Sequence, residues 1–127
     1  MKTITFSASL SFVGNRPFAD VKLNPTHPGA PTHKCLVDTG ADFLQLPLSA
    51  ATKSGLSMAT ATAHLVSTAS GTVTLQRLNG VTVEIEGKTV KVPVLFDPTN
   101  KAPPLAGRGV LLPAFDVGMQ PKAWHRT

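Results

Sequence analysis

Residues 3–12 alternate between polar and apolar side chains, the period-two pattern of a β-strand with one buried face. Gly14-Asn15 follows, and such a pair favours a two-residue hairpin turn. The strand is therefore predicted to fold back onto residues 19–23, before a Pro-rich surface loop at 24–33. The predicted pairs are Leu10 with Ala19, Ala8 with Val21 and Phe6 with Leu23.

A second hairpin is predicted in "VTVEIEGKTVKVPVLF", residues 81–96. A turn at Gly87-Lys88 places valine and isoleucine together on one face and charged residues on the other. Pro93 cannot donate a ladder hydrogen bond, so it indicates an edge or a bulge in that strand. The predicted pairs are Ile85 with Val90, Val83 with Val92 and Val81 with Val94.

A third and weaker hairpin is predicted at 64–78, with its tip at Ser70-Gly71. Its side chains are mostly small and hydroxylic, so we expect a ribbon that projects, moves and serves as a lid. Helix signals are limited to short stretches at 49–56, where Ser49 is a candidate cap, and around 110–115. The chain is therefore predicted to be all-β, with one or two short helices, in one domain spanning residues 1–127.

Composition and charge narrow the possible partners. With 127 residues, 42% of them apolar and 15% charged, the chain is not of the disordered class. The net charge of +5 is scattered without a basic run or stripe, which argues against nucleic-acid binding. The alternating start is unlike a signal peptide, and no segment has the length of a membrane span. We expect a cytoplasmic protein with neither nucleic acid nor membrane as partner.

The candidate chemistry is narrow as well. The four histidines, at 27, 33, 64 and 125, have no metal-ligand spacing among themselves or with the single cysteine, so no metal is predicted. Cys35 lies within an apolar strand run and is expected to be a buried core residue that forms no internal disulfide. Phosphate-binding loops and Gly-x-Ser-x-Gly elbows are absent, and no cofactor is predicted. Carboxylates remain as the source of chemistry.

The segment "CLVDTGAD", residues 35–42, places Asp38 at the end of an apolar run. Asp-x-Gly alone fits an ordinary turn, but it also fits an acid held at a strand end for chemistry. Much later, "PLAGRGVLLPAFD" places Gly107 at the end of another apolar approach. The ribbon at 64–78 and the second hairpin lie between these two segments. In this order, the four features resemble those of the retroviral-type aspartic protease family (retropepsins), over roughly residues 34–118.

The resemblance implies a retropepsin-like barrel of hairpins with a flap, and an aspartic endopeptidase acting on peptide or protein substrates. The chain has a single Asp-Thr-Gly motif, so the family's second aspartate would come from Asp38 of an identical subunit in a homodimer. Thr39 would hydrogen-bond across the dimer axis, and Gly40 would leave room for an extended peptide. Ala41 brings no hydroxyl to the dyad, so activity is expected to extend toward neutral pH.

The resemblance also assigns supporting residues. Asp42 and Arg108 would form a partly buried ion pair beside the active site, next to Gly107. Together with Ala41 and Asp42, the flap tip at Ser70 and Gly71 would contact substrate. Three features depart from the retroviral pattern: the tip has one glycine, Ala106 replaces a bulkier apolar residue before Gly107, and the terminal "MQPKAWHRT" is unlike the family's interface strand.

Two alternatives stay open at the level of sequence. The same dimer would serve as a catalytically weak or inactive peptide-binding module if the reduced flap impaired turnover. A monomeric β-barrel interaction domain, in which Asp38 merely closes a turn, is the other. Sedimentation distinguishes the monomeric alternative from the two dimeric ones, because a shared dyad requires two chains.

Overall fold

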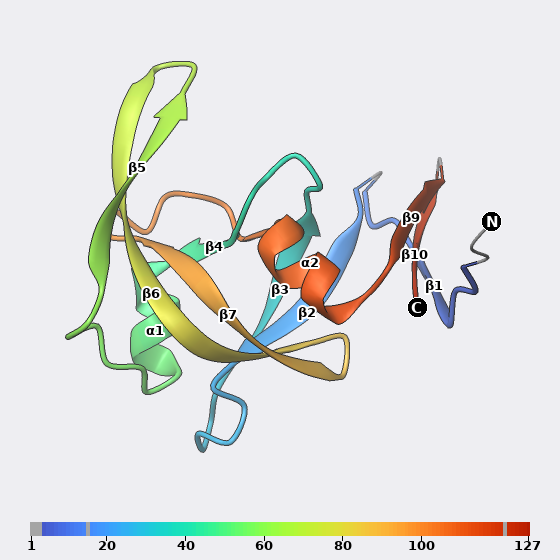
Figure 1. Cartoon of the computed structure of the whole chain (residues 1–127), viewed down its shortest axis with the longest axis horizontal. Coiled ribbons are helices and arrows are strands. Elements are labelled where there is room, and N and C mark those ends of the chain that lie inside the picture. The colour runs from blue at the N-terminus through green and yellow to red at the C-terminus, as the bar shows by residue number, and fades with distance from the viewer. Residues whose placement is uncertain (1–3, 15, 121) are drawn as a thin grey trace.

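The computed structural model describes residues 4–14, 16–120 and 122–127. Strands dominate this part of the chain, as expected, and the two helices are short (Figure 1). In chain order, the elements are β1 (Ala8–Ser11), β2 (Phe18–Leu23), β3 (Thr32–Val37), β4 (Leu44–Pro47), α1 (Leu48–Lys53), β5 (Thr62–Thr68), β6 (Gly71–Ile85), β7 (Lys88–Asp97), β8 (Leu105–Ala106), α2 (Arg108–Ala114), β9 (Val117–Gln120) and β10 (Ala123–Arg126).

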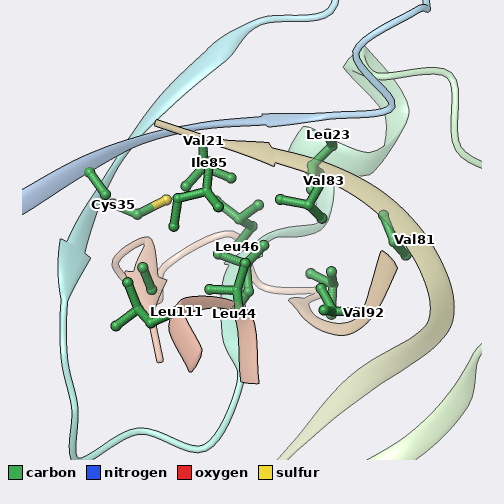
Figure 2. Close-up of a cluster of buried hydrophobic side chains, with 14 of the residues drawn as sticks. Val21, Leu23, Cys35, Leu44, Leu46, Val81, Val83, Ile85, Val92 and Leu111 are labelled. Atoms are coloured by element: carbon green, nitrogen blue, oxygen red, sulfur yellow. The ribbon is translucent and has the colours of Figure 1, made fainter. Parts of the chain in front are cut away.

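The main sheet has seven strands in the order β2-β3-β8-β4-β7-β6-β5, and β2 also pairs with β6. That extra pairing closes the sheet around a core and leaves β5 outside the closed part. Alternate residues of the strands point inward, so the valines, leucines and isoleucines meet in one cluster (Figure 2). Members of this cluster include Val21, Leu23, Cys35, Leu44, Leu46, Val83, Ile85, Val94, Phe96 and Leu111.

The outer half of β6 and β5 form a two-stranded ribbon that projects from the body (Figure 1). The predicted ribbon is therefore present, but its tip lies one residue earlier than expected, because Thr68 pairs with Gly71. The tip is Ala69-Ser70. Gly71 follows it with a φ of 129°, and the Thr68 hydroxyl donates to the Gly71 carbonyl at 2.7 Å.

The first predicted hairpin is wrong in its pairing. Val13 and Arg16 do exchange backbone hydrogen bonds, of 2.8 and 3.1 Å, so the chain reverses there as predicted, although Asn15 itself lies outside the described residues. Beyond that bridge, β1 leaves β2 and pairs with β10 in a separate three-stranded sheet, β1-β10-β9. The β2 strand pairs instead with β3 and β6.

Burial of Trp124 explains this exchange of partners. Its side chain, on β10, is fully buried, and its indole N–H donates to the Phe18 carbonyl at 2.9 Å. Leu10 lies directly opposite Trp124 in the sheet and packs against the same core. Covering so large an aromatic side chain stabilises the pairing of β1 with β10.

The second hairpin is present with a register that differs from the prediction. Ile85 pairs with Lys88 and Val83 with Val90, so the turn is Glu86-Gly87 rather than Gly87-Lys88. Both turn residues have positive φ, 46° and 80°, as a type I′ turn requires. A shift of two residues in the pairing leaves every side chain on the same face, so the apolar pattern cannot distinguish the two registers.

Pro93 lies opposite a β-bulge, which confirms one of the two placements predicted for it. Val92 pairs with Val81 and Val94 with Leu78, so two residues of β6 face this single proline. One of them, Gly80, has a φ of 66°. The bulge accommodates a residue that cannot donate to the ladder.

The helices are close to their predicted positions, with different ends. Pro47, rather than Ser49, occupies the N-cap of α1, and the Ser49 N–H donates to the Asn100 side chain at 3.0 Å. Pro113 is the last residue but one of α2, and because it has no N–H to donate to the carbonyl four residues earlier, it favours the end of the helix at Ala114. Among the described residues, neither helix is long and apolar enough to cross a membrane.

Replacing Gly87 with alanine tests the turn. A Cβ there would meet no atom within 4 Å, so the cost comes from the positive φ alone. We expect Gly87→Ala to lower the free energy of unfolding by about 1 kcal/mol, measured by urea denaturation. Lys91→Ala, at an exposed position of the same hairpin, should change it by less than about 0.5 kcal/mol. Equal effects of the two substitutions would contradict the turn at Glu86-Gly87.

Candidate functional site

Asp38 stands where β3 ends, directly after the buried Val37. The strand is held there because Leu36 and Val37 pair in parallel with Leu105 and Ala106 of β8. The Asp38 N–H continues this ladder by donating to the Ala106 carbonyl at 3.0 Å. The half-buried Asp38 is thus fixed by two strands that lie far apart in the sequence.

The loop after Asp38 is a tight turn that orients the carboxylate. The Gly40 N–H donates to Asp38 Oδ1 at 3.0 Å, and the Ala41 N–H donates to the Asp38 carbonyl at 3.1 Å. A Cβ on Gly40 would lie 3.2 Å from Asp38 Oδ1 and would crowd it. Thr39 and Gly40 are exposed on the described surface. The carboxylate is therefore held by backbone at the surface of the molecule.

A second segment, at the start of α2, crosses under this loop. Successive N–H groups of Gly107, Arg108 and Gly109 donate to the carbonyls of Phe43, Ala41 and Asp42, at 3.2, 2.8 and 2.8 Å. The two glycines permit this approach. A Cβ on Gly107 would lie 2.5 Å from the Phe43 carbonyl oxygen, and one on Gly109 2.6 Å from that of Asp42. The structure thus places Gly107 directly beneath the Asp38 loop.

Asp42 and Arg108 form an ion pair across the same crossing, through Oδ1 and a guanidinium nitrogen. The expected contact is present, but the expected partial burial is not. The Arg108 side chain is 52% exposed and that of Asp42 69%. In the single chain this ion pair is therefore a solvent-screened contact on the surface.

A pocket of about 410 Å³ lies between this loop and the base of the ribbon. Gly40, Ala41 and Asp42 form one side of it. Sequence reasoning missed Phe43 and His64, whose rings contact each other and line the same pocket. The remaining lining residues are Gln45, Leu65, Val66, Ser67, Leu95 and Leu105.

A larger and more apolar pocket, of about 580 Å³, lies under the outer ribbon. Ser70 lines it, together with Val73 and Leu75 of β6 and the loop 97–103. Gly71 lines neither pocket. The structure thus separates the predicted tip residues from the Asp38 loop.

The loop 97–103 is organised by Asp97, whose side chain is 5% exposed. Burial by itself raises the pKa of this carboxyl. The backbone N–H groups of Ala102, Thr99 and Lys101 and the Thr99 hydroxyl all donate to it, at 2.7 to 3.0 Å, and together they lower the pKa below its ordinary value. Asp97 therefore accepts these hydrogen bonds as a charged carboxylate, and in that form it holds the loop that makes one wall of the second pocket.

The remaining candidate groups are not arranged for chemistry. Burial raises the pKa of the Cys35 thiol to about 12, with a further contribution from Asp20, so the thiol is inert and belongs to the core, as predicted. His33 has its pKa lowered by burial and by Lys53. In the described ranges, no three His, Cys, Asp or Glu side chains come together as a metal site.

Comparison with known families agrees with this geometry. The sequence profile of the aspartyl protease family matches residues 21–111, which extend from β2 into α2 and include both crossing segments. The chain therefore belongs to the aspartyl protease family, of the retropepsin-like type. No curated protein gives a significant match to it.

Asp97→Asn tests the anchored loop. The neutral amide of asparagine lacks the negative charge to which three backbone N–H groups donate, so these hydrogen bonds weaken. We therefore expect a loss of about 1–3 kcal/mol in the free energy of unfolding at neutral pH. A lowered pKa in the folded state contributes stability above the ordinary aspartate value of about 4, and that contribution is lost as pH falls through the folded-state pKa. The difference between variant and wild type should therefore shrink in acid.

Urea denaturation from about pH 7 down to about pH 2 measures this dependence. Asp116→Asn is the matched control, because Asp116 is an exposed carboxyl outside the anchored loop. A destabilisation by Asp97→Asn that stays constant across the range would contradict the role of the charge.

A double-mutant cycle tests the ion pair. Because both side chains are exposed, we expect Arg108→Ala and Asp42→Ala to be coupled by only about 0–1 kcal/mol in urea denaturation of the dilute chain. A coupling of about 3 kcal/mol would mean that another surface covers the pair in solution.

Proposed function

We propose that this chain is an aspartic endopeptidase that hydrolyses peptide bonds as a homodimer, with Asp38 of each subunit forming the catalytic dyad. The observation that carries the proposal is the position of Asp38. Its carboxylate is held by Gly40 at the exposed end of β3, beside a pocket wide enough for a peptide side chain. Membership of the aspartyl protease family supports the same reaction.

The requirement for two chains follows from the chemistry. Hydrolysis by aspartic acids needs two carboxyl groups that share one proton, and the chain has one Asp-Thr-Gly motif. A twofold axis beside Asp38 brings equal residues together and supplies the second carboxyl. The exposure of Thr39 and Gly40 is consistent with this, because both would face the partner.

Each carboxyl then has a separate role. Like charges a few ångströms apart do not both ionise, so one member of the dyad keeps its proton. The ionised Asp38 acts as general base on a water molecule, and the protonated one donates to the carbonyl oxygen of the scissile bond. The reaction needs neither a covalent intermediate nor a metal. The β5–β6 ribbon acts as a flap over the bound peptide, with Ser70 near its tip.

Asp38→Asn is the direct test. A neutral amide neither acts as base nor shares the proton, so we expect cleavage of a broad peptide library to fall at least about 100-fold. Pepstatin should inhibit the wild type. Sedimentation velocity and circular dichroism should show the same dimer and fold for both proteins, because the side chains are nearly isosteric. Cleavage by Asp38→Asn near the wild-type rate would rule out the dyad.

A peptide-binding module of the same fold is the second candidate, and the ribbon favours it, because Gly71, which follows the tip, is its one glycine. It predicts that the wild type and Asp38→Asn bind peptides with equal affinity and that neither cleaves them. A wild-type protein that remains monomeric at high concentration would contradict both functions.

A further inference from the structure

Three side chains connect the Asp38 loop to the base of the ribbon. Phe43 comes from the loop, His64 from β5 and Arg77 from β6. The rings of Phe43 and His64 meet edge-to-face, with centroids 5.2 Å apart and an interplanar angle of 77°. The Arg77 guanidinium carbon lies 5.0 Å from the centroid of the Phe43 ring. Phe43 is therefore in contact with both strands of the ribbon.

The register of the ribbon explains this arrangement. His64 pairs with Leu75, and Thr62 with Arg77, so His64 and Arg77 are diagonal neighbours on one face. Leu75, between them on that face, is 3% exposed. Farther out on the same face Val73 is 43% exposed, and Leu65 on the opposite face is 69% exposed.

Both ends of the stack are held in place. The Phe43 carbonyl accepts the Gly107 N–H, so the ring stands on the rigid crossing beneath Asp38. The Arg77 Nε donates to the Asn79 side chain at 2.9 Å, and Asn79 belongs to the bulge opposite Pro93. The guanidinium is therefore oriented by the body of the barrel, where the ribbon begins.

We propose that Phe43 is a positioning residue: its stack with His64 and Arg77 anchors the base of the ribbon to the Asp38 loop and holds the outer ribbon, residues 65–74, over the substrate cleft. The anchoring itself stands on the contacts above. Its consequence for turnover rests on the proposed function, with the ribbon as the flap. Since Phe43 and His64 also line the 410 Å³ pocket, the same stack forms the wall against which a substrate side chain packs.

The energetic scale of the anchor is that of one aromatic pair and one cation–π contact. Together these shift an opening equilibrium by about tenfold. Loss of the Phe43 ring should therefore raise the open population of the ribbon without unfolding the barrel, whose core lies elsewhere. A substrate that binds only to the closed state then binds more weakly, in proportion to the decrease in the closed population.

The first arm of the test needs no catalysis. Backbone ¹⁵N relaxation dispersion should give Phe43→Ala an open population of residues 65–74 about tenfold that of the wild type, while the core segment 81–85 shows no exchange. Phe43→Tyr keeps the ring and should restore wild-type values. Leu65→Ala removes an exposed apolar side chain of the ribbon outside the stack and should leave them unchanged. Equal open populations in wild type and Phe43→Ala would overturn the proposal.

The second arm separates positioning from a merely structural role. Phe43→Ala should raise KM for peptide cleavage by up to about tenfold and change kcat less than about twofold, because bound substrate restores the closed ribbon. A protein that is only destabilised would lose kcat at constant KM. The two arms also separate the hypotheses. If the ribbon opens more in Phe43→Ala but the wild type cleaves no peptide, the anchoring role of Phe43 is supported and the protease function is contradicted. If the wild type cleaves peptides but the ribbon is unchanged in Phe43→Ala, the protease function is supported and the anchoring role is contradicted.

Discussion

The structure depends on the crossing of two backbone segments beneath Asp38. Carbonyls of Ala41, Asp42 and Phe43 accept successive N–H groups from the start of α2, and this approach is possible because Gly107 and Gly109 carry no Cβ. Side chains at those positions would separate the segments by more than a hydrogen bond spans. The aspartate loop, the helix and the parallel strands above it are held in one geometry by this contact, and the site has little freedom to relax.

Closure of the main sheet determines which part of the chain can move. The pairing of β2 with β6 completes the barrel and excludes β5, so β5 and the outer half of β6 protrude together. The barrel buries its apolar side chains almost completely, whereas the ribbon has few to bury. A closely packed barrel and a sparsely packed ribbon are therefore consequences of one topology, and Phe43 lies at the boundary between them.

Local patterns predicted the elements more reliably than their partners. Alternating apolar residues located the strands, and Pro93 correctly indicated an irregularity, because each depends on nearby residues alone. The turn at Glu86-Gly87 was missed by one position, since two registers bury the same faces. Partial burial of the Asp42–Arg108 pair was expected from family resemblance, and the single chain leaves both side chains exposed.

The sequence by itself determined the class of fold, the position of Asp38 at a strand end and the family, because these rest on periodicity and on short ordered motifs. Only the tertiary structure decided the rest. Trp124 draws β1 away from β2, and the stack on Phe43 unites residues from three elements. Both outcomes are set by competition between distant side chains for burial and contact, and no local pattern encodes which of them prevails.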